Sequence, residues 1–577
     1  MSTPETLAAD AETPAPPALP DTTANGRARR AAMLRVDTGA RRPTSLVSYE
    51  STGRVAIIGH AANATAAAER LKDALDCTVL VTAGESPESG DAAVQPSSEG
   101  PGVRTISAAI SAVRGHLGAF EVDVIVNEET QPLAPSLLTA HRPFDIVLDL
   151  CDPPFIGAEV PPPGYFAPRR DPHALEHAVE EIPGLVGEFE KPKYFNYNAD
   201  ICAHGRSGIT GCTRCMEACP TDAIRSLEEL IEVDPFLCQG GGSCTTACPT
   251  GAITYAYPAV SDLLTELRGA LATYGEAGGG VPCVLLHDAE RGRAWVGETA
   301  ESLPENLIPY ELEEIGAAGL DAWLALVAYG ARQVVLWCPA NVPASVKSEI
   351  EHQLGIAGII LEGMGYPKSL LVCADEGDDE WISAVPASDA LDVERASFAA
   401  VDEKRTNIRL AVDHLYARAP APVDHVALNR GAPFGEVLVN RDTCTLCMAC
   451  VSVCPASALS DGGDEPKLKF IEWNCVQCGL CETACPEDAI TTAPRFLFDA
   501  KQRRESRLLN EDTPFNCIVC GKAFATTSVI ERMREKLSGH WMFQKPEAVE
   551  RLQMCETCRV KDMFKDGGGL LDVHDDA

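Results

Sequence analysis

The sequence predicts a multidomain protein of mixed α/β and α+β class, in which two parallel-sheet segments alternate with two cysteine-dense modules. Its 577 residues are enough for several domains, and an apolar fraction of 45% is ordinary for a globular chain. Short apolar runs alternate with helical patterns in two stretches, which is typical of α/β folds. Most of the 24 cysteines lie in short runs that follow these two stretches.

The first α/β segment is predicted over residues 49–189. Residues 1–48 precede it and are expected to be disordered, because they are rich in Ala, Pro, Thr and charge. The turn after the first strand contains only Gly59 and not the G-x-G-x-x-G of dinucleotide-binding proteins, so an ordinary strand-to-helix turn is favoured over a phosphate site. The expected elements are strands over 55–58, 78–81, 122–126 and 146–150 and a helix over 64–75.

A second α/β segment is predicted over residues 261–430. Cys338 stands at the end of one of its strands, where α/β sheets place ligands, so it keeps a functional interpretation beside that of a buried apolar residue. The other cysteines outside the metal-binding patterns lie in apolar runs and are interpreted as small hydrophobic residues. The expected elements are strands over 283–286, 334–337, 358–361 and 370–373 and helices over 261–273, 319–329 and 346–354.

The module predicted over residues 431–500 contains two complete copies of the run C-x2-C-x2-C-x3-C-P. In bacterial dicluster ferredoxins, three thiolates of such a run hold one [4Fe–4S] cluster and the fourth thiolate reaches the other cluster. Zinc does not need a third thiolate at this spacing, and disulfides belong to oxidising compartments. The predicted ligand sets are Cys444, Cys447, Cys450 and Cys485 for one cluster and Cys475, Cys478, Cys481 and Cys454 for the other.

The module predicted over residues 190–260 is an imperfect copy. Its first run has Ile209 in place of the leading cysteine, and Cys202 is the natural substitute across the intervening loop. Its second run has Gly241 in place of the second cysteine. The predicted ligand sets are Cys202, Cys212, Cys215 and Cys248 for one [4Fe–4S] cluster and Cys238, Cys244 and Cys219 for a second centre.

The second centre of this imperfect module has no fourth thiolate, because glycine has no side chain. A [3Fe–4S] cluster is the first interpretation, and a [4Fe–4S] cluster with a ligand other than cysteine is the second. Loss of the cluster is the third. The spacing rule does not choose between them.

The tail predicted over residues 501–577 contains two C-x2-C pairs separated by a stretch with a helical pattern over 528–537. Paired knuckles of this kind are typical of a structural zinc site of the zinc-ribbon type. Another iron or iron–sulfur centre and a redox dithiol are the alternatives. The four predicted metal ligands are Cys517, Cys520, Cys555 and Cys558.

The charge of the chain argues against nucleic acid as a partner, because the formal net charge is −36 and phosphate binding needs surplus Lys and Arg. An acidic surface suits docking on a basic patch of a redox partner protein, and it serves solubility equally well. No apolar run is long enough to predict a membrane span, and no secretory signal is recognised in the first 30 residues. The reducing cytoplasm is therefore the expected location.

The motifs in four stretches resemble those of the large cytoplasmic 4Fe–4S ferredoxin-type proteins of bacteria that accompany formate dehydrogenase and its maturation chaperone. The middle of the chain is also faintly similar to hydrogenase delta-subunit domains, but it lacks a cluster motif of its own. The stretches are Ile201–Ser207 with Gly211–Cys215, Thr254–Pro258, Arg441–Cys454 and Trp473–Ile490. Gly241 departs from the usual cysteine of such runs, which leaves the second cluster of that module in question.

This resemblance implies electron transfer between a dehydrogenase, with formate dehydrogenase as the candidate, and a cellular acceptor. No Walker loop, nucleophile elbow or H-E-x-x-H motif occurs in the sequence, so no catalytic residue is assigned. A soluble electron carrier is the leading hypothesis. A flavin- or nicotinamide-coupled iron–sulfur oxidoreductase, and an accessory protein for metalloenzyme maturation, are the alternatives.

Overall fold

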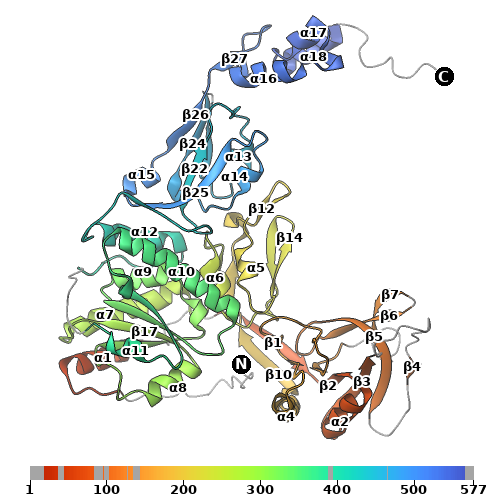
Figure 1. The fold of residues 1–577 in the computed structure, drawn as a ribbon, viewed down its shortest axis with the longest axis vertical. Coiled ribbons are helices and arrows are strands. Elements are labelled where there is room, and N and C mark those ends of the chain that lie inside the picture. The colour runs from red at the N-terminus through yellow and green to blue at the C-terminus, as the bar shows by residue number, and fades with distance from the viewer. Residues whose placement is uncertain are drawn as a thin grey trace.

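The structure is a computed structural model of the chain. Figure 1 shows an elongated molecule with the first α/β segment at one end and the C-terminal tail at the other. The second α/β segment lies beside the first at that end, with the imperfect module between and above them, and the complete module connects the imperfect module to the tail. Within the described residues, no helix is long and apolar enough to span a membrane. The described residues are 19–36, 44–82, 95–96, 103–126, 128–133, 143–386, 394–463 and 465–565.

The first α/β segment is built on a mixed sheet. Its described elements are β2 Arg54–Gly59, α2 Ala61–Leu71, β3 Asp76–Thr82, β4 Gln95–Pro96, β5 Arg104–Arg114, β6 Glu121–Val126, β7 Glu129–Pro132, β8 Ile146–Asp149, β9 Tyr165–Phe166 and α4 Pro172–Glu181. The strand order is β7-β6-β5-β3-β2-β8-β9, with β4 beside β5. Strands β3, β2 and β8 are parallel neighbours as predicted, but β6 pairs antiparallel with β5, so this sheet is not wholly parallel.

A short antiparallel ribbon leads from this sheet toward the imperfect module. It consists of β1 Leu46–Ser51 and β10 Gly187–Pro192, which pair along their whole length. Tyr49 on β1 donates a hydrogen bond to the carbonyl of Phe236, and Lys191 on β10 donates to the carbonyls of Phe236 and Cys238. The ribbon therefore fixes the first α/β segment directly to a predicted ligand loop.

A helix within the N-terminal residues was not expected from the sequence. Helix α1 (Ala24–Arg35) begins at Thr23, whose side chain accepts a hydrogen bond from the backbone of Gly26, and its Ala28 and Ala32 are fully buried. The predicted disorder over 1–48 is therefore wrong for residues 24–35, and also for residues 46–48 at the start of β1, while residues 1–18 and 37–43 lie outside the described residues. Two alanines four residues apart make a helix face small enough for close packing. The buried guanidinium of Arg29 donates its hydrogen bonds to backbone carbonyls. Composition predicted disorder here because it does not reveal these two features.

The second α/β segment has a four-stranded parallel sheet in the order β18-β17-β19-β20 within the described residues. Its elements are α7 Val260–Glu276, β17 Cys283–Asp288, α8 Arg291–Glu298, β18 Leu307–Leu312, η4 Ile315–Ala317, α9 Leu320–Ala328, β19 Gln333–Cys338, α10 Ala344–Gly363, β20 Leu371–Asp375, α11 Glu380–Ser383 and α12 Lys404–Tyr416. Helices α1 and α7 pack together on this sheet, and their apolar residues share its main core.

Two predictions for this segment are wrong. The strand expected at 358–361 is the last part of α10, because a short apolar run has the same pattern in a buried helix as in a buried strand. The sequence also missed β18, which contains Pro309 and lies at the edge of the sheet. An edge strand tolerates proline because one side of its backbone needs no partner.

The two cysteine-dense modules share one plan of strands. In the imperfect module, β11 Phe195–Tyr197 pairs with β16 Ile253–Tyr255, and β14 Ile224–Leu227 forms a hairpin with β15 Leu230–Val233. In the complete module, β22 Gly435–Val439 pairs with β25 Ile490–Leu497, and β23 Leu459–Gly462 pairs with β24 Glu465–Phe470. Short helices hold the third cysteine of each run: α5 Arg214–Glu217, α6 Ser243–Ala247, α13 Ala449–Ser452 and α14 Leu480–Thr483.

Additional strands join the complete module to its surroundings. β21 (His425–Ala427) pairs with β25, and β26 (Arg507–Glu511) pairs with β24. The tail then contains β27 Pro514–Asn516, β28 Ala523–Thr526, α16 Thr527–Leu537, α17 Pro546–Arg551 and α18 Glu556–Lys565. Helix α16 confirms the helix expected over 528–537. Strand β26 continues the sheet of the complete module beyond residue 500, the limit predicted for that module from the sequence.

Candidate metal centres

In the complete module, the first three cysteines of one run meet the last cysteine of the other. A small cavity is lined by Cys444, Cys447, Cys450 and Cys485, together with apolar residues such as Leu468 and Ile490, and by no other cysteine. Burial raises the pKa of Cys450 to about 12, and the thiols of Cys444, Cys447 and Cys485 add to this effect. The cavity brings together the ligand set predicted from the crossed pattern.

The second set of this module is equally compact. Burial raises the pKa of Cys478 to about 12, with contributions from the nearby thiols of Cys475 and Cys454. Burial also raises the pKa of Cys481, next to the same two thiols and Cys478. The structure thus brings together Cys454, Cys475, Cys478 and Cys481, as the spacing predicts.

Backbone amides point at the sulfur atoms of both runs. Ala458 donates to the Sγ of Cys454 at 3.2 Å, and Ala489 donates to the Sγ of Cys485 at 3.3 Å. The amide side chain of Gln477 donates to the Sγ of Cys475 at 3.2 Å. Such hydrogen bonds stabilise thiolates, and they tune the potential of an iron–sulfur cluster when one is bound.

In the imperfect module, Cys202 takes the place of the missing first cysteine. The thiols of Cys212 and Cys215 interact electrostatically with those of Cys202 and Cys248, and burial is the main cause that raises the pKa of Cys212 to about 11. The residues between Ala203 and Ile209 therefore loop out without displacing Cys202 from the set.

The loop is closed at its base by hydrogen bonds that the sequence did not reveal. Cys212 donates its backbone N–H to the carbonyl of Ala203, and strands β12 (Gly205–Arg206) and β13 (Ile209–Thr210) form a short hairpin beyond it. His204 is 1% exposed, and its two ring nitrogens bond the carbonyl of Cys212 at 2.9 Å and the hydroxyl of Ser226 at 2.7 Å. His204 therefore holds the loop beside Cys202 in place, and its only sign in the sequence was its position within the stretch Ile201–Ser207 that carries the resemblance.

The last set of the imperfect module has three thiols. Cys244 interacts with Cys238 and Cys219, and burial strongly raises the pKa of Cys244. A Cβ atom on Gly241 would meet only the ring of Pro220, at 3.6 Å, which is an ordinary contact. Its neighbours Gly240 and Gly242 have φ angles of 80° and 74°, which glycine adopts readily. Position 241 therefore has room for the first atom of a side chain, although its neighbours must be glycine.

The thiols of the two modules have the chemistry that iron–sulfur clusters need. They are soft donors, buried or half-buried, and grouped in sets of four or three. Because burial holds many of them in the neutral form, binding of iron as thiolate would release protons. The residues present therefore fit four clusters, with one fewer cysteine ligand at the set next to Gly241.

The two modules touch each other at their inner sets. A Cβ atom on Gly211 would lie 2.8 Å from the side chain of Leu480, which is completely buried between the modules. Leu480 precedes Cys481, and Gly211 precedes Cys212, so the contact joins one ligand loop to the other. Cys478 interacts electrostatically with Cys212 across this junction.

Two consecutive residues of α12 place buried positive charge at the same junction. Lys404 donates hydrogen bonds to the carbonyls of Thr245, Thr246 and Cys248 at 2.6 to 3.1 Å. Arg405 donates to the carbonyls of Pro249, Pro433, Trp473 and Cys475, and its guanidinium lies 4.8 Å from the ring centroid of Trp473. Lys404 thus serves a ligand of the imperfect module, and Arg405 bridges both modules.

A polar cavity lies beside Lys404, between the imperfect module and the second α/β segment. It is lined by hydroxyl and amide side chains and by the carboxylates of Asp321 and Asp402. Burial raises the pKa of Asp321, and the charge of Lys404 opposes that shift. The ammonium of Lys404 already donates to three carbonyls, so its hydrogen bonds hold the backbone of the module.

The four cysteines of the tail form one compact site. The ligand atoms of Cys517, Cys520, Cys555 and Cys558 all lie within 4.8 Å of one another, and the Sγ atoms of Cys520 and Cys555 are 3.7 Å apart. Burial opposes ionisation of Cys517, but backbone N–H groups of Cys520, Cys555 and Val519 lower its pKa to about 6. Four converging sulfurs with amide support fit a tetrahedral metal such as zinc.

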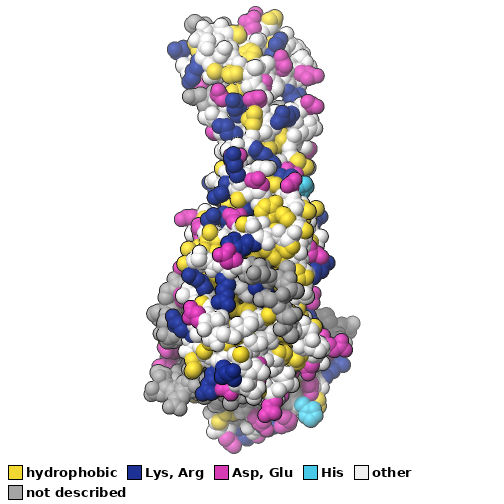
Figure 2. Space-filling view, turned by 90° about the vertical axis from the view of Figure 1, so that its left-hand side faces the viewer, with side chains coloured by type: hydrophobic (Ala, Val, Ile, Leu, Met, Phe, Trp, Pro, Cys, Tyr) yellow, Lys and Arg dark blue, Asp and Glu magenta, His cyan; other side chains and the backbone are white. Residues whose placement is uncertain are grey.

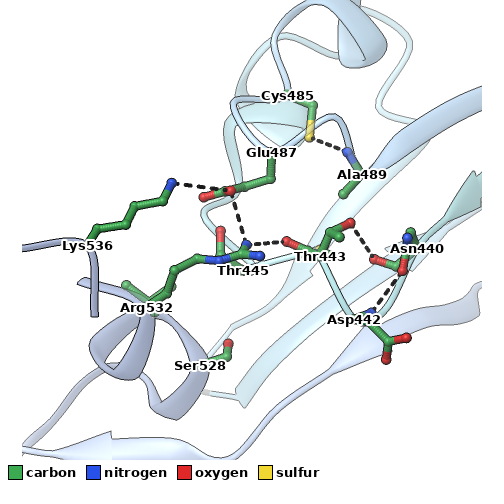
Figure 3. Close-up of polar contacts among 12 residues, drawn as sticks. Asn440, Asp442, Thr443, Thr445, Cys485, Glu487, Ala489, Ser528, Arg532 and Lys536 are labelled. Atoms are coloured by element: carbon green, nitrogen blue, oxygen red, sulfur yellow. Dashed lines mark hydrogen bonds and ion pairs between the residues drawn. The ribbon is translucent and has the colours of Figure 1, made fainter. Parts of the chain in front are cut away.

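The tail is bound to the complete module beside the thiol set that contains Cys444. Figure 3 shows Arg532 of α16 between the carbonyl of Thr443 and the carboxylate of Glu487, at 2.7 and 3.0 Å, with Lys536 on the same carboxylate at 3.8 Å. The hydroxyl of Thr526 donates to the carbonyl of Thr445. Thr443 and Thr445 flank Cys444, so the tail reaches the ligand loop itself.

The strand plan and the thiol sets of the two modules are those of dicluster ferredoxin domains. Residues 187–252 and residues 436–490 each match the family of 4Fe–4S dicluster domains. Over 54 residues, 9% of this chain, the sequence is 41% identical to one component of an ion-translocating oxidoreductase complex from Methanosarcina acetivorans. That match spans 20% of the relative's length. The chain therefore contains two 4Fe–4S dicluster ferredoxin domains, with the second matching region inside the complete module.

Proposed function

We propose that this protein relays single electrons between a dehydrogenase and a second redox protein, through four iron–sulfur centres held in series. The observation that carries this proposal is the junction of Gly211 and Leu480, which brings Cys212 of one dicluster domain within electrostatic reach of Cys478 of the other. Clusters of this class, when bound, each accept and release one electron. Two such domains joined through their inner thiol sets favour a continuous path over two independent carriers.

The order of the ligand sets follows from their contacts. The set of Cys219, Cys238 and Cys244 lies at the end next to the β1–β10 ribbon and η4, and the set of Cys444, Cys447, Cys450 and Cys485 lies at the end next to the tail. The two sets that contain Cys212 and Cys478 lie between them. One end of the proposed series thus adjoins the α/β segments, and the other end adjoins the tail.

The three-thiol set is proposed to hold a [3Fe–4S] cluster, and the other three sets are proposed to hold [4Fe–4S] clusters. Metal analysis should then give about 15 irons, with one zinc in the tail, and the oxidised protein should show a [3Fe–4S] signal in low-temperature electron paramagnetic resonance (EPR). About 16 irons without that signal, in anaerobic and mildly oxidised protein, would contradict this assignment and favour a non-cysteine ligand.

The variant Gly241→Cys tests the same assignment by supplying the missing fourth thiol. A Cβ atom at position 241 meets only Pro220, at ordinary contact distance, so a cysteine can be introduced there without displacing the loop backbone, and its thiol is expected to complete the set. The [3Fe–4S] signal should disappear and the iron content should rise by about one. Gly157→Cys is the matched control, because nothing lies within 4 Å of a Cβ atom there and the site lies outside the dicluster domains. An unchanged signal in Gly241→Cys would overturn the proposed three-thiol ligation.

The dehydrogenase partner is proposed to be a formate dehydrogenase, on the resemblance of the cysteine motifs. The test mixes the purified protein with catalytic formate dehydrogenase and formate, and follows bleaching of the cluster absorbance. Rapid bleaching that depends on both components is expected. Reduction by dithionite but not by this system would retain the electron carrier and exclude this donor.

The same proposal includes zinc in the tail, the cytoplasmic location and the six domain limits predicted from the sequence.

On the face of the molecule that Figure 2 shows, Lys and Arg side chains alternate with Asp and Glu. A partner with a uniformly basic docking surface would therefore bind at another face. Steep loss of the electron-transfer rate with salt would show that charge guides docking; a flat salt dependence would assign docking to apolar contacts.

A further inference from the structure

Two cysteines outside the iron–sulfur and tail patterns lie together in the second α/β segment. The Sγ atoms of Cys338 and Cys373 are 3.2 Å apart. Cys338 ends β19 opposite Asp375, and Cys373 precedes Asp375 by two residues on β20, so all three side chains lie on one face at the carboxyl ends of parallel strands. This is the edge at which α/β sheets place ligands and reacting groups.

The surroundings of the pair favour thiol chemistry over metal binding. Asp375 is close enough to both sulfurs to serve as a third metal ligand, but both of its oxygens accept hydrogen bonds from Lys347 at 2.8 Å. The carboxylate is therefore already engaged by an ammonium group. A hydrogen bond between the two sulfurs raises the pKa of Cys338, with help from burial, and the same bond lowers the pKa of Cys373.

The two thiols also differ in exposure, as reacting thiol pairs do. Cys338 is 2% exposed, whereas Cys373 is half-buried. By contrast, Cys77 and Cys283 are single thiols sealed in the sheets, with 1% and 0% exposure. A thiolate-prone outer cysteine beside a protonated inner cysteine is the arrangement in which a disulfide forms and opens readily.

The pair lies on the same side of the sheet as the three-thiol set. Cys338 shares the apolar core with Ile315 of η4 and with Val346 of α10. Gly316 of η4 accepts a hydrogen bond from Thr246, and a Cβ on Gly316 would lie 2.3 Å from the carbonyl oxygen of Gly241. The short helix η4 thus contacts both strand β19, which ends at Cys338, and the glycine loop of the dicluster domain.

We propose that Cys338 and Cys373 form a redox-active dithiol that exchanges two electrons with the neighbouring one-electron carriers. On oxidation the two S–H bonds break and one S–S bond forms, with release of two protons to water and two electrons. The acceptors are oxidised iron–sulfur clusters, which take one electron each. The sulfurs need to approach by only about 1 Å to reach a disulfide bond length. The role of the clusters as electron acceptors rests on the proposed function, whereas the redox activity of the thiol pair does not.

The experiment equilibrates the anaerobically purified full-length protein in dithiothreitol buffers, from fully reduced to fully oxidised. Free thiols are blocked with one maleimide isotope, disulfides are then reduced and labelled with a second isotope, and the peptides that contain Cys338 and Cys373 are read by mass spectrometry. A reversible disulfide between these two residues is expected. Reductive titration of the oxidised protein should consume two more equivalents in the wild type than in Cys373→Ser. Cys77→Ser, a buried thiol of the other sheet, should match the wild type.

Two results would overturn the proposal. In one, both thiols take the first label at every potential, so that no disulfide forms. In the other, a metal ion retained by the pair blocks labelling until a chelator removes it. Cluster reduction is measured by EPR in the same samples, so that failure of the electron relay is separable. If the disulfide forms reversibly but the clusters are never reduced, the proposed electron relay is wrong and the proposed redox-active dithiol is retained.

Discussion

The two dicluster domains share their strand plan but hold their thiols in different ways. In the complete domain each run supplies all four cysteines at regular spacing, and its sulfurs accept hydrogen bonds from nearby backbone amides such as that of Ala458. In the imperfect domain His204 closes the loop behind Cys202, while from outside the domain Lys191 bonds the carbonyl of Cys238 and η4 packs against the glycine loop. The difference teaches that a ligand lost from a repeat is tolerated where the surrounding fold supplies the missing order.

The largest effect is expected when one run of the complete domain loses its second cysteine, as the run with Gly241 in the imperfect domain has. Cys478 holds the position in its run that Gly241 holds in the other, so Cys478→Gly removes the equivalent ligand. We expect the iron content to fall by about one and a second [3Fe–4S] signal to appear. Iron analysis and EPR check this. If the cluster is instead lost completely, with about four irons, the two domains differ in more than one ligand.

The next effect concerns the junction of the two domains. Valine at position 211 would clash with Leu480 and with the carbonyl of Ala203, because a Cβ atom alone comes within 2.9 Å of both. We expect electron equilibration between the domains to slow several-fold, because the two inner thiol sets are forced apart, with metal content unchanged. Freeze-quench EPR after partial reduction measures this rate.

Gly157→Val is the matched control for the junction variant, since a Cβ atom there meets nothing within 4 Å. Equal equilibration rates in Gly211→Val, its control and the wild type would show that electrons do not cross between the domains at this contact. The series arrangement would then fail while each domain remained a carrier.

A smaller effect is expected from the two buried charges of α12. Loss of a positive charge disfavours the reduced, more negative cluster, so Arg405→Met should lower the potential of the centre that contains Cys475, and Lys404→Met that of the centre that contains Cys248. A charge several ångströms away is worth about 1–2 kcal/mol, which is on the order of 50–100 mV. EPR-monitored redox titration resolves the two centres.

Arg405→Lys keeps the charge but not the bridging hydrogen bonds, so it separates electrostatics from structure. A near wild-type potential in Arg405→Lys with a lowered potential in Arg405→Met supports the charge effect. Equal shifts in both variants would assign Arg405 a purely structural role.

The smallest effect concerns Glu314, which precedes η4 under the imperfect domain. Burial, with help from Asp288, Glu313 and Glu290, raises the pKa of Glu314 from 4.5 to about 8. Between these pH values the unfolded chain has lost the proton that the folded protein keeps, so stability falls as pH rises through this window. Glu314→Gln should therefore gain a few degrees in melting temperature relative to the wild type as pH rises from about 5 to about 9.

Glu298→Gln, on the exposed side of α8, should show no such pH-dependent gain. Thermal melts of the three proteins at several pH values make the comparison. A constant difference between Glu314→Gln and the wild type across that range would mean that Glu314 is not protonated in the folded protein.

The sequence predicted the features of this protein that depend on short stretches of chain. A run of cysteines with fixed spacing defines its ligands because the intervening backbone is too short to place them otherwise, and the crossed sets at Cys485 and Cys248 follow from that rule. Strands β2, β3, β6 and β8 of the first sheet and β17, β19 and β20 of the second were also predicted from their apolar runs, whereas β5 and β18 were missed. The strand predicted at 358–361 was wrong because local pattern does not distinguish a buried helix from a buried strand. The disorder predicted at 24–35 was wrong because burial decides whether a face of alanines is solvated or packed.

Only the tertiary structure decided which distant residues meet. The contact of Gly211 with Leu480, the cations of Lys404 and Arg405, and the pairing of Cys338 with Cys373 join residues that are far apart along the chain. The sequence by itself determined that the protein holds iron–sulfur clusters and how many thiols each set has. The packing of its domains determined the order of those sets and the charges beside them, because burial and electrostatics act through space rather than along the chain.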